Sequence, residues 1–241
     1  MPSKELSDAI AVVTGGGRGI GRAIAAKLST LDATVIITGR DERRLQQVAN
    51  ELGVNGRRVH AMRCDVADRG SAEEFGERLR RDYGRVNVLV NNAGIGGPGG
   101  LFLHQLDPED WDAIFNTNLR GVYYMLRAVV PLMIATGAGH IINISSLAGK
   151  NPLPRGAAYS ASKWGLNGLS YGVAEELRDH NIRVSVVCPG SVDTDFSPRR
   201  QGKDTSRMLK AEDVAHAVEV LVTQAPQSFM SEILLRPTQK P

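Results

Sequence analysis

Short apolar runs recur along this chain, and the stretches between them carry apolar residues three or four positions apart. Such runs are typical of strands buried on both faces of a parallel sheet, whereas the wider spacing is typical of helices packed against it. The runs predict seven strands, at residues 9–13, 34–38, 58–64, 86–90, 140–144, 182–187 and 229–235.

Helical segments fill the gaps between the predicted strands. The first follows a glycine-rich turn, and Asp41 and Asp68 are expected to cap the next two, because aspartate accepts hydrogen bonds from free N–H groups at a helix start. The later helices are predicted over residues 109–135, from Tyr159 onward, and over residues 211–222. The alternation predicts an α/β fold, a Rossmann-type doubly wound parallel sheet of seven strands with helices on both faces.

Length and charge narrow the picture further. The 241 residues suffice for one large core, and neither repeat nor linker interrupts the pattern, so a single domain over residues 1–241 is expected. The net charge is only +3, and basic residues alternate with acidic ones, so no nucleic-acid partner is expected. A polar N-terminus and the lack of a long apolar run predict neither a signal peptide nor a membrane span, and hence a cytoplasmic protein.

Cysteine and histidine offer little chemistry in this sequence. Cys64 and Cys188 lie in apolar strand-like runs, which favours small buried side chains over a disulfide or a nucleophile. The five histidines are scattered, and no metal site is predicted.

A glycine-rich loop, Thr14-Gly15-Gly16-Gly17-Arg18-Gly19-Ile20-Gly21, joins the first strand to the first helix. Glycines let a backbone approach a phosphate, and a helix N-terminus offers free N–H groups and a partial positive charge. The spacing Gly-x-x-x-Gly-x-Gly departs from the common Gly-x-Gly-x-x-Gly pattern. A tight turn is the alternative, but it would not require so many glycines, and we favour a cofactor loop.

Arg40 follows the second strand, where dinucleotide-binding folds select their cofactor. An acidic residue in this region binds the ribose 2′-hydroxyl of NAD, whereas an arginine accommodates the 2′-phosphate of NADP. Arg18 in the glycine loop is within reach of the same phosphate, and two arginines around a dianion are electrostatically favourable. We therefore predict NADP(H) rather than NAD(H).

Polar residues follow several predicted strands, and each has a structural alternative. Asp65 is expected either to bond nearby backbone or to contact an adenine amine. Asn92 would bridge backbone segments or meet a cofactor. Ser145 and Ser146 are typical turn formers, and Asn118, inside a helix, would ordinarily be exposed and inert.

Tyr159 and Lys163 stand four residues apart at the start of a helical pattern, on one face and one turn from each other. A free tyrosine has a pKa near 10, and a nearby ammonium favours the phenolate, which makes proton transfer feasible. The pair alone is weak evidence, because many helices contain it by chance.

Together these motifs resemble the short-chain dehydrogenase/reductase family, over nearly all of the chain. The matching motifs, in family order, are Thr14-Gly15-x-x-x-Gly19-x-Gly21, Asn91-Asn92-Ala93-Gly94, Asn118, Ser146, Tyr159-x-x-x-Lys163 and Pro189-Gly190. The resemblance implies an NADP(H)-dependent oxidoreductase that reduces a carbonyl to an alcohol by hydride transfer.

The resemblance also assigns roles to four catalytic residues. Tyr159 would donate the proton in reduction, and Lys163 would hold the nicotinamide ribose and lower the pKa of Tyr159. Ser146 would bond the substrate carbonyl, and Asn118 would bind a water that relays protons to Lys163. The expected cofactor-binding residues are Gly15, Arg18, Gly19, Ile20, Gly21, Arg40, Asp65, Val66, Asn92, Tyr159, Lys163, Val192 and Thr194.

Within the family the chain is most similar to the 3-oxoacyl-[acyl-carrier-protein] reductases, with two departures. Glu175 stands where those enzymes commonly carry an arginine that meets the acidic carrier, and Leu234 to Thr238 replace their usual C-terminus. Because an acid repels an acidic partner, a reductase or dehydrogenase of free small ketones, aldehydes or hydroxy acids is the alternative. A non-catalytic NADP-binding sensor is a remote alternative, since it predicts loss of catalytic residues.

Gly165, Gly168 and Gly172 form a stripe on the Tyr159 helix. Glycine is unfavourable inside a helix, so the stripe predicts close packing against a helix of another subunit. We expect a homo-oligomer, a dimer or a homotetramer, through the Asn118 and Tyr159 helices. The polar segment 195–209 is expected to be either a substrate lid or a solvated loop.

Overall fold

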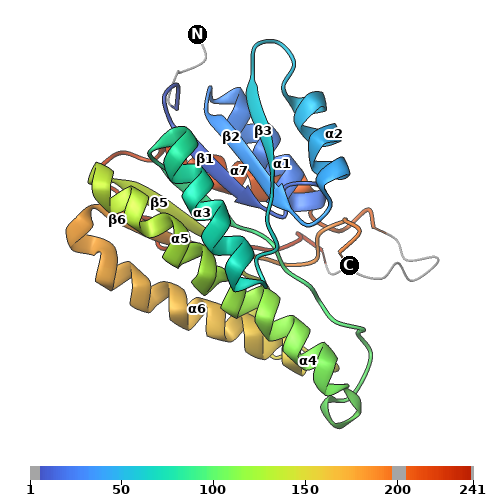
Figure 1. Cartoon of the computed structure of the whole chain (residues 1–241). Helices are drawn as coiled ribbons and strands as arrows, with labels where there is room; N and C mark the ends of the chain where they lie inside the picture. The colour runs from blue at the N-terminus through green and yellow to red at the C-terminus, as the bar shows by residue number, and fades with distance from the viewer. Residues whose placement is uncertain (1–5, 197–204, 240–241) are drawn as a thin grey trace.

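A computed structural model describes residues 6–196 and 205–239. Its centre is a parallel sheet with the strand order β3-β2-β1-β4-β5-β6-β7, covered by helices on both faces (Figure 1). The strands are β1 (Ile10–Thr14), β2 (Thr34–Gly39), β3 (Arg58–Arg63), β4 (Val88–Asn91), β5 (Gly139–Ile144), β6 (Ile182–Pro189) and β7 (Glu232–Leu235). The predicted Rossmann-type fold with seven strands is confirmed.

The helices form two layers. The α-helices are α1 (Gly19–Thr30), α2 (Glu42–Leu52), α3 (Arg69–Tyr83), α4 (Pro108–Phe115), α5 (Gly121–Thr136), α6 (Ala157–Leu177) and α7 (Ala211–Thr223). Two short turns matter for the site, a π-helical turn η2 (Asn116–Arg120) and a 3₁₀ turn η3 (Leu147–Gly149). Helices α1, α2 and α7 pack on one face of the sheet, and α3, α5 and α6 pack on the other.

Strand β1 shows why the apolar runs are nearly continuous. All five of its residues are buried. Successive strand residues point to opposite faces, so Val13 joins the core under α1 and α7 while Val12 joins the core under α3 and α5. Both faces therefore demand apolar side chains, as in other parallel sheets.

Most predicted boundaries hold, and two strand boundaries differ. The carboxylates of Asp41 and Asp68 accept hydrogen bonds from the backbone N–H of Arg44 and Ser71, at 3.1 and 2.6 Å, which confirms both N-caps. The last strand begins at Glu232 rather than residue 229, because pairing with β6 starts there. The fourth strand is displaced to Val88–Asn91.

The long helix predicted over residues 109–135 is interrupted by the π-helical turn η2. By length and composition alone, the continuous segment Pro108–Thr136 is apolar enough to cross a membrane, with a mean hydropathy of 1.2. In this fold α5 packs against α3 and α4 packs against α6, so its apolar residues partly serve the core. Trp111, Tyr123 and Ile134 of this segment are exposed.

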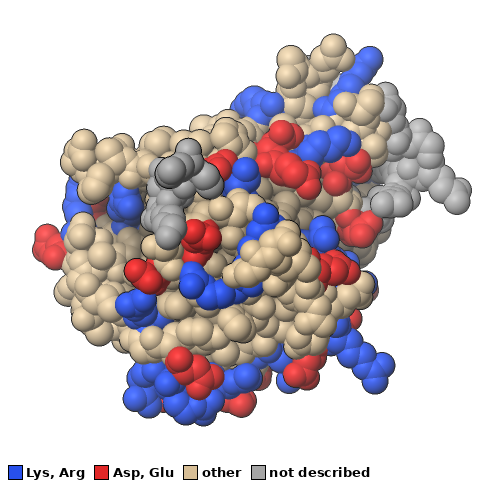
Figure 2. All heavy atoms as spheres, turned by 90° about the horizontal axis from the view of Figure 1, so that it is seen from above, with Lys and Arg blue, Asp and Glu red and all other residues tan. Residues whose placement is uncertain are grey.

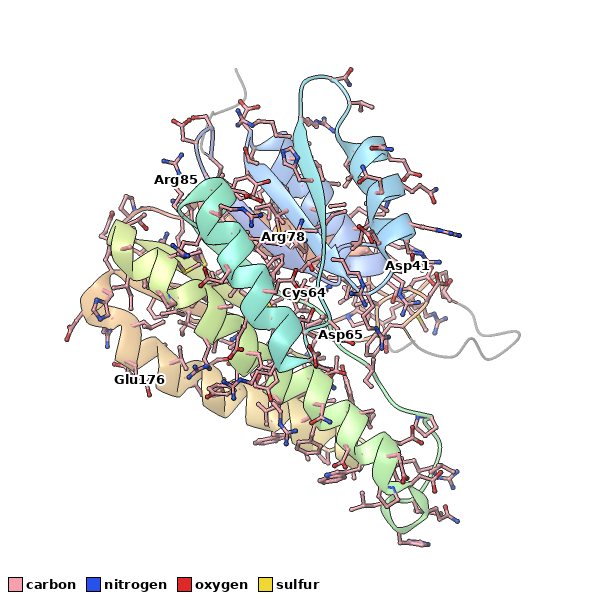
Figure 3. All side chains as sticks on the ribbon, viewed as in Figure 1. Asp41, Cys64, Asp65, Arg78, Arg85 and Glu176 are labelled. Atoms are coloured by element: carbon pink, nitrogen blue, oxygen red, sulfur yellow. The ribbon has the colours of Figure 1, made fainter. Side chains whose placement is uncertain are left out.

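The strand order indicates the edge of the sheet at which a ligand is expected to bind. Strand β1 lies between β2 and β4, so the chain reverses its direction of winding there. In such sheets ligands bind at the carboxyl ends of the strands, near this reversal. Figure 3 places Asp65 beyond the end of β3 and Asp41 at the start of α2, both at this edge, with Arg85 near the opposite edge.

The charges on the surface are mixed. Figure 2 shows Lys and Arg side chains interleaved with Asp and Glu over the face it presents, rather than gathered in one patch. On that face the basic side chains do not form the continuous stripe that is typical of nucleic-acid-binding surfaces.

His140 in β5 is a buried titratable residue, 3% exposed. The hydroxyl of Ser185 donates to the Met230 carbonyl at 2.6 Å, so the His140 Nε2 hydrogen must donate to that hydroxyl, 2.8 Å away. Its Nδ1 has no partner among the described residues. Burial, with a smaller effect of Arg183, lowers the pKa of His140 to about 3.

This histidine should make folding sensitive to mild acid. An unfolded histidine has a pKa of about 6.5, so between pH 7 and pH 5 the unfolded chain takes up a proton that the folded chain does not. The free energy of unfolding should therefore fall by about 2 kcal/mol from this residue over that interval. Urea unfolding of the wild type and of His140→Asn at both pH values checks this. The pH dependence should shrink by that amount in the variant, and an unchanged dependence would contradict the assignment.

Candidate active site

A cleft of about 1630 Å³ opens at the carboxyl ends of the strands. Its walls come from the glycine loop, from the segments that follow β2 to β6, from the start of α6 and from the end of β7. The predicted site residues that line it are Gly15, Arg18, Gly19, Ile20, Arg40, Asp65, Val66, Asn92, Ser146, Tyr159, Lys163, Val192 and Thr194. Gly21 and Asn118 lie behind its wall.

The glycine loop is held against the end of β4. The Asn92 side chain donates to the carbonyls of Thr14 and Gly15, at 2.9 and 3.3 Å. A Cβ on Gly21 would lie 2.3 Å from the Gly15 carbonyl oxygen and 2.5 Å from the Asn92 amide. Gly21 therefore permits α1 to begin directly against the loop, which turns the first N–H groups of the helix toward the cleft. Asn92 fulfils the bridging interpretation and lines the cleft as well.

Three arginines surround the same end of the cleft. Arg18 and Arg40 were predicted, and Arg44 joins them. All three are exposed, and none is paired with a carboxylate among the described residues. Free guanidinium groups around a cradle of helix N–H groups fit a phosphate dianion.

Arg44 was missed because its role depends on the helix start. Asp41 caps α2, so Arg44 occupies the third helical position, within the first turn. From there its stem lies 3.5 Å from where a Cβ on Gly17 would stand, in the glycine loop. The predicted N-cap at Asp41 could have indicated Arg44, because the third residue of a helix that starts there lies beside the glycine loop.

Asp65 bonds nearby backbone, the first of its two interpretations, and the contact with an adenine amine stays a prediction. One carboxylate oxygen accepts from the Ala67 N–H at 3.0 Å, and the residue also lines the cleft. The neighbouring Cys64 is buried, and burial raises the pKa of its thiol to about 11. Cys188 is also buried, and both thiols are free, which confirms their role as small buried side chains.

Tyr159 and Lys163 lie on the first turns of α6, with the ammonium 5.8 Å from the centre of the phenol ring. Lys163 is 4% exposed, and its ammonium donates to the Ile144 carbonyl at 2.9 Å. Burial lowers the pKa of Lys163 to about 8.

The expectation that Lys163 lowers the pKa of Tyr159 is not met in this structure. Burial raises the pKa of Tyr159 to about 12, and a hydrogen bond with Ser146 offsets only part of that rise. The physical reason is that removal from water destabilises the phenolate more than the nearby polar groups stabilise it. The Lys163 ammonium itself is directed at the Ile144 carbonyl. Tyr159 is therefore protonated at neutral pH, the form that a proton donor requires.

The structure distinguishes the two serines after β5. The Ser146 hydroxyl accepts from the Ala148 N–H at 3.1 Å at the start of η3, and the residue lines the cleft. Ser145 lines the cleft as well but is more deeply buried, and its hydroxyl donates to the Lys163 carbonyl at 3.4 Å. Ser146 thus forms the turn and lies in the cleft with Tyr159.

Asn118 is not the exposed, inert residue that a helical asparagine usually is. It is 0% exposed and lies in the π-helical turn η2. Its amide donates to the Ile95 carbonyl at 2.9 Å and to the Ser162 hydroxyl at 3.0 Å, and its oxygen accepts from the Ile95 N–H at 2.8 Å. Both N–H bonds are thereby used by protein partners, which fixes the strand-end loop beside Lys163.

The opposite end of the cleft is apolar. Phe196 lies 6.0 Å from Tyr159, centre to centre, and Leu153 and Met208 line the wall. Residues 197–204 of the expected lid, with Arg199, Arg200 and Lys203, lie outside the described residues. No group of three or more His, Cys, Asp and Glu side chains within residues 6–196 and 205–239 could hold a metal ion.

Comparisons with known proteins agree with this geometry. The profile of the family described as short chain dehydrogenase matches residues 9–205. An uncharacterized oxidoreductase from Staphylococcus saprophyticus is 34% identical over 234 residues, 97% of this chain and 99% of its own.

Three solved structures extend the comparison. A metagenomic short-chain oxidoreductase in complex with NADP is 47% identical, with a TM-score of 0.86 over 98% of this chain and 100% of its own. An alcohol dehydrogenase from Thermococcus sibiricus, complexed with 5-hydroxy-NADP, is 32% identical, with a TM-score of 0.89 over 97% and 98%. A variant of the actinorhodin polyketide ketoreductase with NADPH is 30% identical, with a TM-score of 0.86 over 98% and 97%.

Proposed function

Because the chain belongs to the short-chain dehydrogenase family and is an oxidoreductase, we propose that it reduces a carbonyl to an alcohol with NADPH. The observation that carries the proposal is the convergence, in one cleft, of a protonated phenol, a buried ammonium and an unpaired arginine cluster. We expect the enzyme to work in the cytoplasm.

The residues present fit NADP(H). The arginine cluster of Arg18, Arg40 and Arg44 supplies the charge for a 2′-phosphate, and the start of α1 supplies N–H groups for a pyrophosphate. The similar solved structures that hold NADP or NADPH support the same choice. When bound, the cofactor supplies the hydride.

The chain's own residues supply the rest of the reaction. Ser146 bonds the carbonyl oxygen and stabilises the charge that develops on it. Tyr159, which is protonated at neutral pH, donates its proton to that oxygen. Lys163 then faces a phenolate, which its ammonium stabilises, and Asn118 keeps the Ile95 loop and the α6 turn in place around both. In this scheme Asn118 also lies on the route by which protons return to Lys163.

Two substrate classes remain, and each has support. The likeness to a polyketide ketoreductase and the motif spacing favour a 3-oxoacyl thioester, either bound to a carrier protein or free. Free small ketones, aldehydes or hydroxy acids are favoured by Glu175, which is exposed and paired with Arg178 at 2.8 Å near the end of α6. The likeness to an alcohol dehydrogenase supports the second class.

Removing the Tyr159 hydroxyl tests the mechanism. Tyr159→Phe should lower kcat for carbonyl reduction by about 10²–10⁴-fold, because it removes the general acid. Fluorescence titration should show NADPH binding within about twofold of the wild type, since the ring remains. Retained turnover in this variant would contradict the proposed role.

Cofactor choice is tested by reversing one charge of the arginine cluster. Arg40→Asp should raise KM for NADPH by about 10–100-fold, because a charge-assisted contact is replaced by repulsion. The KM for NADH should stay constant or fall. Arg43→Asp is the matched control, since Arg43 is exposed on α2, three residues after Arg40, but does not line the cleft. Equal effects of the two substitutions would refute the assignment.

We also propose that the subunits associate through α4, α5 and α6. An apolar groove there is lined by Phe115, Leu119, Arg120, Tyr123, Gly165 and Leu169. Tyr123 in the groove and Trp164 of α6 are each about half exposed. A Cβ on Gly168 or Gly172 would meet nothing within 4 Å. Gly165 instead faces Leu119 of its own subunit, at 3.1 Å, so only part of the glycine stripe is available to a partner.

An arginine placed on this face should separate the subunits. Gly168→Arg should convert the oligomer into monomers, because it puts a charge into an apolar interface. Light scattering at micromolar concentration, with Gln47→Arg on the opposite face of the sheet as control, reports the mass. A monomeric wild type would end the proposal.

A further inference from the structure

Three polar side chains form a connected cluster outside the cleft. Lys150 directly follows η3, Tyr171 lies in α6, and Glu232 begins β7. The Lys150 ammonium lies 2.6 Å from the Glu232 carboxylate and donates to the Tyr171 hydroxyl at 2.5 Å. The Tyr171 hydroxyl in turn donates to the same carboxylate oxygen at 2.8 Å.

The cluster is better built than an ordinary surface ion pair. The side chains of Lys150 and Glu232 are only 26% and 25% exposed, and the ammonium lies 5.1 Å from the centre of the Tyr171 ring. Partial burial alone would raise the pKa of Glu232, but hydrogen bonds from Lys150 and Tyr171 outweigh it and the pKa is lowered. Through these contacts the cluster joins the end of η3, the middle of α6 and the start of β7.

One of those elements carries the catalytic serine. Ser146 starts η3 and Lys150 follows its end, so the cluster fixes the far side of the turn that orients the Ser146 hydroxyl. The turn lies directly on α6, because a Cβ on Gly149 would be 2.9 Å from the Lys163 carbonyl oxygen. Asn167 adds a bond of 2.9 Å to the Gly149 carbonyl from α6.

None of the three cluster residues lines the cleft, so they do not touch a substrate there. We propose that Lys150, Tyr171 and Glu232 are positioning residues that hold Ser146 in register with Tyr159 for carbonyl reduction. The inference rests on the proposed function and adds residues that the motifs do not contain. Mispositioning of a reacting group costs rate, while cofactor binding at the other end of the cleft is left intact.

Lys150→Met tests the proposal, because it keeps the length of the side chain and removes the charge. We expect kcat for carbonyl reduction to fall by about 10–100-fold. NADPH binding stoichiometry and affinity should remain within about twofold of the wild type. Lys150→Arg should restore most of the rate, because it returns the charge. Arg80→Met, which breaks an exposed ion pair on α3, is the matched control and should not change kcat.

Action through Ser146 is tested by combining substitutions. In a Ser146→Ala background, Lys150→Met should change the residual rate by less than about twofold, because the group that it positions is gone. The proposal is overturned if Lys150→Met keeps wild-type kcat, if its effect is undiminished in that background, or if it acts by abolishing NADPH binding. Should Lys150→Met fail to fold, Glu232→Gln is measured in the same way and decides on the same outcomes. Absence of carbonyl turnover by the wild type would overturn the proposed function itself, whereas normal turnover with an unaffected variant would overturn the cluster alone.

Discussion

The site depends on burying one ammonium group. Lys163 is almost fully enclosed, and a buried charge is costly unless polar groups meet it. The carbonyl of Ile144 meets it at the carboxyl end of β5, which requires α6 to lie across the end of that strand. A chain of hydrogen bonds supports the same placement, from Asn91 to Asn143 at 2.9 Å and from Asn143 to Ser170 of α6 at 2.8 Å.

With α6 fixed in this way, the division of the cleft follows. The phenol of Tyr159 lies near η3 and Phe196, in surroundings that keep it protonated. The glycine loop and its arginines occupy the other end, beyond β1 and β2. A phosphate-binding end and an apolar, proton-donating end in one cleft suit a charged redox cofactor and an uncharged carbonyl side by side.

Much of this arrangement could be predicted from residue patterns, because the predictable features are local. Strands buried on both faces must be apolar, and an aspartate before a helix caps it, as Asp41 and Asp68 do. The motif residues that follow different strands could be placed in one site, because the carboxyl ends of parallel strands meet at one edge of the sheet. Ser146 is preferred over Ser145 because it keeps the family's spacing to Gly149; both serines line the cleft, and Ser145 is the more deeply buried.

What could not be predicted depends on contacts between distant segments. The burial of Asn118 arises from the Ile95 loop, and the cluster of Lys150, Tyr171 and Glu232 joins residues up to 82 positions apart, the difference between 232 and 150. The predicted direction of the Tyr159 pKa shift was wrong for a related reason. Helical spacing reports a nearby charge, whereas the extent of burial depends on the whole fold.

We propose that the arginine end and the Tyr159 end of the cleft serve one reaction, NADPH-dependent carbonyl reduction. The most direct test follows the loss of NADPH absorbance with purified protein and a panel of carbonyl compounds, repeated with NADH. The panel contains acetoacetyl thioesters on carrier protein and on coenzyme A, a β-keto ester, and simple aldehydes and ketones. We expect NADPH consumption equal to alcohol formed with at least one of these compounds, and slower turnover with NADH. Tight binding of NADPH without its consumption with any of them would refute this function and favour a non-catalytic NADP-binding protein.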